Sequence, residues 1–210
     1  MPKLLWIDLE TTGLDPRVDD ILEVAAGTAD LTSPFTLDDR SREGLDPEPV
    51  RSWLTRFRWA PGSWRPEVQE MHRSSGLLKQ HAESTRDEVH YLGEVERLLL
   101  DVVPDPAGFS AALTQEQRRD EITILAGSSV HFDLAFIRNT MPTLASRLSH
   151  RVYDVSAVKL FCRSLGMDKI PRKDAHRAAQ DVLESIEHAR ICWAWLEATH
   201  GGKPSMVYPF

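Results

Sequence analysis

Apolar and polar residues alternate along the chain with two different periods, which predict strands first and helices later. Five short apolar or alternating stretches predict strands: residues 3–8, 21–29, 49–59, 121–126 and 152–155. Four stretches with apolar residues every three or four positions predict helices: residues 84–103, 133–141, 156–165 and 174–199. Three strands in succession, followed by alternating strands and helices, indicate an α/β domain whose mixed sheet starts with antiparallel strands.

The length and the absence of repeats limit the domain organisation. A chain of 210 residues corresponds to one domain with elaborations. Residues 38–50 and 104–120 interrupt the pattern of strands and helices and contain many turn-forming and polar residues. We therefore expect a single domain over residues 1–210, with insertions near 38–50 and 104–120.

Charge and cysteine content narrow the class of partner and the compartment. The formal net charge is −7, whereas proteins that bind long nucleic acids through many phosphates are normally basic. An acidic chain suits a small ligand, and it suits carboxylates that bind metal ions. Cys162 and Cys192 alone make no disulfide framework. The N-terminus lacks a signal-peptide pattern and no apolar run approaches about 18 residues, so we expect a cytoplasmic protein without a membrane span.

Two carboxylates at the end of the first predicted strand are candidates for metal binding. Asp8 and Glu10 are two residues apart, so a strand places both on the same face. Two close carboxylates raise each other's pKa unless a cation lies between them. Hard cations such as Mg²⁺ take carboxylate oxygens as ligands. The alternative is an ordinary strand end that faces water.

Three further polar residues, taken together with Asp8 and Glu10, favour a functional site over an ordinary strand end. Asp133 lies at the expected start of a helix, where an aspartate usually caps or interacts with the helix dipole. His176 and Asp181 lie five residues apart on the last predicted helix. Each residue alone is ordinary, but the ordered set of four acids and one histidine is not.

This set and the residues around it resemble the DEDDh exonucleases of the DnaQ-like, RNase H-fold superfamily. Asp8-x-Glu10-Thr11-Thr12-Gly13-Leu14 matches the first motif of that superfamily. Finer blocks are similar to the oligoribonuclease branch: His72-x-x-Ser75-Gly76-Leu77, Arg151-x-x-Asp154-Val155-Ser156 and His176-x-Ala178-x-x-Asp181-x-x-Glu184-Ser185-Ile186. The similarity covers nearly the whole chain. It implies an RNase H-like mixed β-sheet flanked by helices.

The resemblance also implies a catalytic centre. Asp8, Glu10, Asp133 and Asp181 would bind two Mg²⁺ or Mn²⁺ ions, and His176 would be the general base. Two such ions, about 4 Å apart, can activate water and stabilise the departing 3′-oxygen of a phosphodiester. A histidine with a pKa near neutrality can accept the proton of the attacking water. The expected products are nucleoside 5′-monophosphates.

A second group of residues would bind the substrate. By resemblance, Leu14 is the apolar wedge between two terminal bases, and His72 caps the 5′ phosphate of a dinucleotide. Ser129, Arg151 and Ser156 match phosphate-binding positions, and His150 stands where the family supplies a stacking tyrosine across a homodimer. Without the matching blocks, His72 would be an ordinary helix-face histidine and Arg151 a surface charge. A site of this kind binds very short RNA and needs no basic track, which agrees with the net charge.

Some positions depart from the family pattern. The family often has tryptophan where this chain has Glu67, and it has tyrosine where this chain has His150. Gln180 replaces the first aspartate of an aspartate pair, and Asp181 is retained. These departures concern the preference for dinucleotides, not hydrolysis.

The sequence therefore predicts a metal-dependent 3′–5′ exoribonuclease for short oligoribonucleotides, including linear products of cyclic dinucleotides. The nearest alternative is a broader single-strand DNA or RNA 3′–5′ exonuclease. A third is a non-catalytic dinucleotide- or RNA-binding module, whose expected signature is the loss of one of the acids or of the histidine. None of the five is lost.

Overall fold

The computed structural model describes residues 3–29, 50–57, 64–172 and 176–200. One six-stranded sheet has the order β4-β3-β2-β1-β5-β6. Its strands are β1 (Leu4–Thr11), β2 (Ile21–Thr28), β3 (Arg51–Thr55), β4 (Val89–His90), β5 (Ile124–Gly127) and β6 (Val152–Asp154). Strands β1, β2 and β3 pair antiparallel, as predicted, whereas β4, β5 and β6 each pair parallel to a neighbour.

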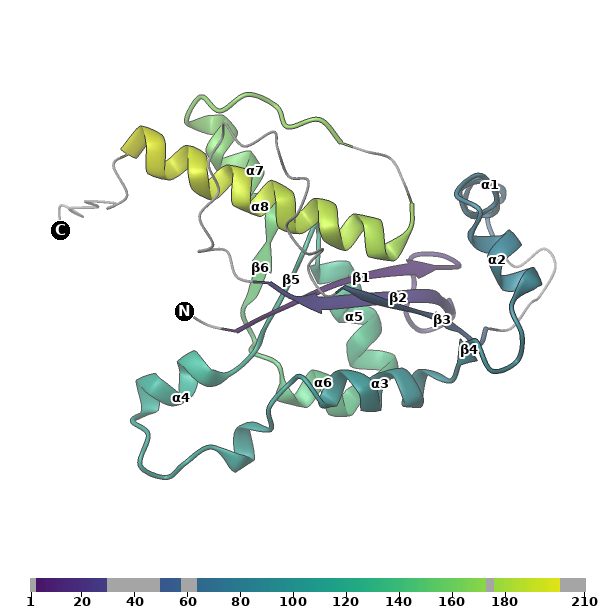
Figure 1. Cartoon of the computed structure of the whole chain (residues 1–210), viewed down its shortest axis with the longest axis horizontal. Helices are drawn as coiled ribbons and strands as arrows, with labels where there is room; N and C mark the ends of the chain where they lie inside the picture. Colours follow the sequence, from purple (N-terminus) through teal and green to yellow (C-terminus); the bar gives the residue numbers. More distant parts are fainter. Residues whose placement is uncertain (1–2, 30–49, 58–63, 173–175, 201–210) are drawn as a thin grey trace, which may run out of the picture.

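Helices cover both faces of this sheet (Figure 1). The described α-helices are α1 (Pro66–Ser74), α2 (Leu77–Glu83), α3 (Leu92–Leu100), α4 (Gln115–Glu121), α5 (His131–Thr140), α6 (Pro142–Arg147), α7 (Val155–Ser164) and α8 (Ala178–His200). Helices α3, α5 and α6 lie against one face, and α7 and α8 lie against the other, while α1 and α2 lie at one end of the sheet. None of the described helices combines the length and apolar character that a membrane crossing requires.

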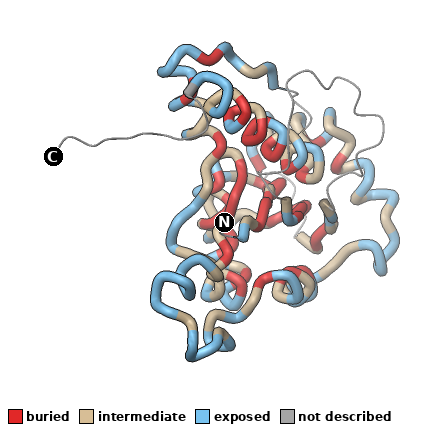
Figure 2. The backbone as a smooth tube through the Cα atoms, turned by 60° about the vertical axis from the view of Figure 1, so that its left-hand side comes forward, coloured by how far each residue is buried: buried red, intermediate tan, exposed pale blue. Residues whose placement is uncertain are grey.

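The alternation of side chains along β1 divides the core in two. Leu5, Ile7 and Leu9 pack with α3, α5 and α6, whereas Trp6 packs with the apolar side of α8. Figure 2 shows the buried residues following the strands and the inward sides of the helices. Because side chains alternate with a period of two, Asp8 and Glu10 lie on the face that α8 covers.

Several predicted boundaries are wrong. The predicted helix at 84–103 begins only at Leu92, because Val89 and His90 pair with Leu54 and Thr55 as the short strand β4. The predicted insertion at 104–120 contains a 3₁₀ turn (Pro106–Gly108) and most of α4, which Thr114 and Gln117 begin with a capping box. Helices α1, α2 and α6 were not predicted. The predicted insertion at 38–50 lies outside the described residues except for its last position.

Candidate active site

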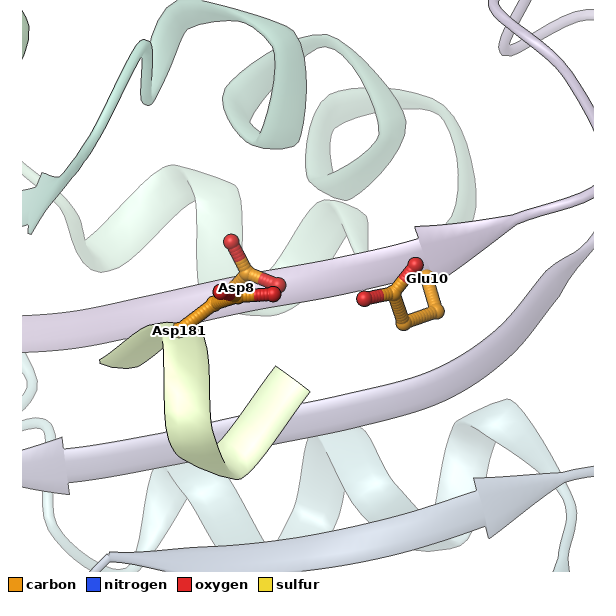
Figure 3. A group of neighbouring side chains, drawn as sticks. All are labelled: Asp8, Glu10 and Asp181. Carbon is orange, nitrogen blue, oxygen red and sulfur yellow. The ribbon is translucent and has the colours of Figure 1, made fainter. Parts of the chain in front are cut away.

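Three carboxylates from distant parts of the chain meet on the α8 face of the sheet. Asp8 and Glu10 lie on β1, and Asp181 lies in the first turn of α8. One carboxylate oxygen from each lies within 4.8 Å of the others. Figure 3 shows Asp181 reaching from α8 to Asp8, with Glu10 further along the same strand. This oxygen-only donor set fits a hard divalent cation.

The packing of α8 brings Asp181 to the strand. Ala178 and Val182 are buried against the sheet, and Asp181 lies between them in the first helical turn. The backbone N–H of Asp181 donates to the Arg177 carbonyl at 3.0 Å, which closes that first turn. The apolar face of α8 therefore decides where the carboxylate lies.

The crowded carboxylates have raised pKa values. Burial, and then the charges of Asp133 and Glu10, raise the pKa of Asp8 well above its usual range. Burial raises the pKa of Glu10 to about 8, and the Asp181 and Glu23 carboxylates add to this rise. Burial also raises the pKa of Asp181. A bound cation would relieve both the repulsion and the desolvation, so the electrostatics agree with the donor geometry.

Asp133 lies next to this group but is not one of the three converging oxygens. It is buried in the first turn of α5, and its Oδ1 accepts the backbone N–H of Leu9 at 3.0 Å. Burial raises its pKa to about 7, against the effect of its backbone hydrogen bonds. Its charge is the first electrostatic contribution, after burial, to the raised pKa of Asp8. The structure thus places Asp133 beside the carboxylate group, with one of its oxygens holding β1.

His176 precedes α8 and faces the same space as the carboxylates. A cavity of about 310 Å³ is lined by Asp8, Glu10, His176 and Asp181 among others. The backbone φ of His176 is +48°, a left-handed conformation that costs energy for a residue with a Cβ atom. His176 therefore lines the cavity from a strained position of the backbone.

Two serine pairs line another part of this cavity. Ser129 Oγ lies 3.2 Å from Ser156 Oγ, and Ser128 Oγ lies 2.9 Å from Ser185 Oγ. The Ser129 N–H donates to Asp154 Oδ1 at 3.0 Å, and the same oxygen accepts the Ser156 N–H at 2.8 Å. Asp154 thus joins the turn after β5 to the start of α7, and it brings the two predicted serines together.

Two cations in the cavity were not predicted from the sequence. Lys159 and Arg172 both line it. Lys159 lies one turn after Ser156 on α7, a three-residue spacing that could have pointed to a shared face. Its Nζ donates to His188 Nδ1 at 3.1 Å. No local pattern points to Arg172, which is the last described residue before the gap at 173–175.

His72 is fully buried beside Glu10. Its Nε2–H donates to the Thr11 carbonyl at 2.8 Å, and its Nδ1 lies 3.7 Å from Glu10 Oε2. Burial lowers the pKa of this imidazole. The ring of Trp64 packs edge-on against it, whereas Glu67, at the family's tryptophan position, is exposed. In this structure His72 supports the end of β1, and its contact with a 5′ phosphate stays a prediction.

Leu14, His150 and Arg151 are exposed and do not line the cavity. Leu14 is 70% exposed in the loop after β1. The Asp19 carboxylate holds that loop by accepting the Thr12 hydroxyl and the Asp15 N–H, and a Cβ at position 13 would collide with it. His150 and Arg151 lie just before the edge strand β6. Their contact with substrate stays a prediction.

Comparison with solved structures defines the class of fold. Over 96% of its length the chain resembles E. coli exonuclease I in complex with a dT13 oligonucleotide, with a TM-score of 0.60 and 15% identity, and it spans 43% of that chain. It resembles the Mg²⁺- and Mn²⁺-bound form of S. pombe Pop2p with a TM-score of 0.54 and 12% identity, over 95% of this chain and 84% of that one. The fold is therefore that of the RNase H-like, DnaQ-like exonucleases.

Sequence comparison is more specific. The chain is 32% identical to an oligoribonuclease of Mycobacterium bovis over 193 residues, which cover 90% of this chain and 79% of the relative. It is 32% identical to the oligoribonuclease of Arabidopsis thaliana (89% and 75% covered) and 31% identical to the mitochondrial oligoribonuclease of Bos taurus (90% and 71% covered). No protein-family model matches the sequence. The chain belongs to the oligoribonuclease family, which makes it a 3′–5′ exonuclease hydrolase.

Proposed function

We propose that this chain is a metal-dependent exoribonuclease that removes nucleotides from the 3′ end of short oligoribonucleotides, down to dinucleotides. The observation that carries the proposal is the convergence of Asp8, Glu10 and Asp181 in one cavity with His176. Linear products of cyclic dinucleotides are short enough to be substrates as well. The products are nucleoside 5′-monophosphates.

The residues present fit a pair of Mg²⁺ or Mn²⁺ ions. Asp8, Glu10 and Asp181 offer converging oxygens, and Asp133 would be the fourth acid through the oxygen that does not hold Leu9. When bound, such ions polarise the scissile phosphate and lower the pKa of water. Four neighbouring carboxylates repel each other strongly. This repulsion supports a bound cation over a carboxylate cluster that only stabilises the fold.

The protein groups around the ions would orient the reacting atoms. His176 is the general base in this proposal, and its Nδ1 or Nε2 would take the proton from the attacking water. The carboxylates of Asp8 and Asp181 would fix the position of the phosphate relative to that imidazole. The buried wall of the cavity would limit the access of competing water, which strengthens these electrostatic contacts.

We further propose a substrate site that is short. Ser129 and Ser156 would donate hydroxyl hydrogen bonds to a phosphate beyond the scissile bond, together with Arg151 and His72. Leu14, which is exposed on a loop held by Asp19, would separate the two bases of a dinucleotide. The net charge of −7 supports a short substrate over a long polyanion.

The proposed assembly is a cytoplasmic homodimer, in which His150 of one chain would stack on a base bound to the other. Large apolar side chains are exposed on β6, on α7 and at its C-terminal cap, and this supports the proposal: Val152, Leu160, Phe161 and Leu165. Such a surface is typical of a protein interface. Cys162 and Cys192 are both free and buried.

A cleavage assay tests the proposed function. The purified chain is incubated with 5′-labelled RNAs of two, five and twenty nucleotides and with matched single-stranded DNA, in Mg²⁺, Mn²⁺ or EDTA. We expect fast, metal-dependent loss of the dinucleotide and slow use of the longest RNA. Equal or better use of long RNA or DNA would replace the proposal with the broader exonuclease. Binding of dinucleotide without any cleavage would leave a binding module.

A further inference from the structure

A buried ion pair lies next to the carboxylate group without belonging to it. Glu23 on β2 is 1% exposed, and its carboxylate accepts three N–H groups. Arg177 Nη2 donates to Oε1 at 3.1 Å, Arg177 Nε donates to Oε2 at 3.2 Å, and the Ala178 N–H donates to Oε2 at 3.1 Å. Arg177 Nη2 also donates to Gln80 Oε1.

The position of Glu23 in the sheet makes this burial unexpected. In the β1–β2 ladder Glu23 lies directly opposite Glu10, so both side chains lie on the same face as neighbours. A like charge opposite a metal ligand destabilises the folded state. Both oxygens of Glu23 are occupied by donors, and Glu23 is not among the carboxylates whose oxygens converge. The Glu23 carboxylate therefore binds Arg177 and the Ala178 N–H, and it is not part of the proposed metal site.

The three donors all belong to the two residues after His176. Arg177 donates two side-chain N–H groups, Nε and Nη2, to the Glu23 carboxylate. The backbone N–H of Ala178, the first residue of α8, donates to the same carboxylate. His176 has a φ of +48°, a conformation that persists only where the surrounding contacts over-determine it. The contacts of Glu23 hold the backbone immediately after this strained residue. Together with the packing of Ala178 on the sheet, these hydrogen bonds tie that backbone to β2.

We infer that Glu23 and Arg177 are positioning residues that hold the backbone of His176, so that its imidazole faces the carboxylates of the cavity. The inference rests on the proposed function, in which His176 is the general base. Glu23 acts through His176 and contacts neither substrate nor metal. Its loss therefore lowers kcat at saturating metal and leaves the KM for the dinucleotide nearly unchanged.

The variant that tests this is Glu23→Gln, which keeps the shape but offers one acceptor oxygen where three N–H groups converge. We expect kcat for a dinucleotide to fall about tenfold or more, because a small misplacement of a reacting group costs up to about a hundredfold. The assay is run at saturating Mn²⁺, because the charge of Glu23 also acts on Glu10, and KM should then change less than about twofold. Glu121→Gln is the matched control, because Glu121 pairs with Lys3 at the surface.

A double-mutant cycle with His176→Ala separates positioning from a general structural role. If Glu23 acts through His176, Glu23→Gln in the His176→Ala background should lower the remaining single-turnover rate by less than about twofold. A loss of kcat that persists in that background overturns the inference. So does an unchanged kcat in the single variant at saturating Mn²⁺. Should Glu23→Gln not fold, Arg177→Lys replaces it in the same cycle, since lysine keeps the charge but not the fork.

Imidazole NMR gives a reading that does not depend on catalysis. The His176 ring signals are assigned by their absence in His176→Ala. Glu23→Gln should shift the His176 signals, because the backbone of His176 is held by the Glu23–Arg177 ion pair. The signals of the exposed His131, which is not held by that ion pair, should stay in place. Unchanged His176 signals overturn the inference even if the chain cleaves RNA. Shifted signals in a chain that cleaves nothing would support the inference and remove the proposed function.

Discussion

The Nδ1 atom of His72 lies 3.7 Å from Glu10 Oε2, while Nε2 of the same ring donates to the carbonyl of Thr11. Helix α1 thus holds the end of β1 at the point where that strand presents a carboxylate to the cavity. The sequence resemblance assigns His72 to the substrate, whereas its observed contacts are with the protein itself. The two roles predict different results for one substitution.

His72→Ala should lower the free energy of unfolding by about 2 kcal/mol, because it removes a buried hydrogen bond and leaves a cavity. Denaturant unfolding measures this. If His72 also meets the 5′ phosphate, the preference for a 5′-phosphorylated dinucleotide over an unphosphorylated one should fall. Equal losses on both dinucleotides would restrict His72 to its contact with Thr11. His131→Ala is the control, since that side chain is exposed.

Asp181→Asn should reduce cleavage about a thousandfold, because a metal ligand contributes several kcal/mol to the stabilisation of the transition state. The metal-free variant should nevertheless melt a few degrees higher than the parent chain, since one of three crowded negative charges is gone. Activity assays and thermal melts in EDTA measure the two effects. Asp101→Asn, on an exposed position after α3, should change neither. Near-normal metal-dependent cleavage by Asp181→Asn would contradict the assigned site.

Without metal, the stability of the chain should fall as the pH rises from about 5 to about 8. Burial raises the pKa of Glu10 to about 8 and that of Asp133 to about 7, from usual values of 4.5 and 3.8. Such a group holds its proton in the folded state at pH values where the unfolded chain has lost it, so stability decreases as the pH rises through the folded pKa. Thermal melts in EDTA across this range measure the slope.

Divalent metal should reverse this trend, because the ion binds the deprotonated carboxylates. The rise in melting temperature on adding Mn²⁺ should therefore be larger at pH 8 than at pH 5.5. Binding should also release protons, which calorimetry in two buffers of different ionisation enthalpy detects. Melting temperatures in EDTA that do not change with pH would show that the carboxylates are not crowded in solution.

Leu160→Asp should dissociate the proposed homodimer, because Leu160 on α7 is 67% exposed and its apolar neighbour Phe161 is exposed as well. Sedimentation velocity should show a dimer for the parent chain and a monomer for the variant. Val102→Asp, at an exposed position after α3, should leave the dimer intact. If His150 completes the site of the other chain, the monomeric variant should also lose activity on dinucleotides. A parent chain that sediments as a monomer would remove the proposed assembly.

The elements that the sequence predicts well are those whose pattern is local and long. Strands β1 and β2 and helices α5, α7 and α8 each have enough apolar residues at one period to be recognised. Strand β4 was missed because two residues carry no period, and Val89 becomes a strand residue only by pairing with Leu54. Helices α1 and α2 were missed because their buried residues are few, His72 and Leu77.

The same distinction holds for the site. The sequence by itself determined that Asp8 and Glu10 share one face, since the period of a strand is two, and the ordered motifs determined the family. Only the tertiary structure decided that Asp181 reaches those carboxylates, because the packing of α8 on the sheet sets that distance. It also decided that Glu23 meets Arg177, 154 residues away in the chain. Contacts of this kind depend on how whole elements pack, and no local pattern of residues encodes them.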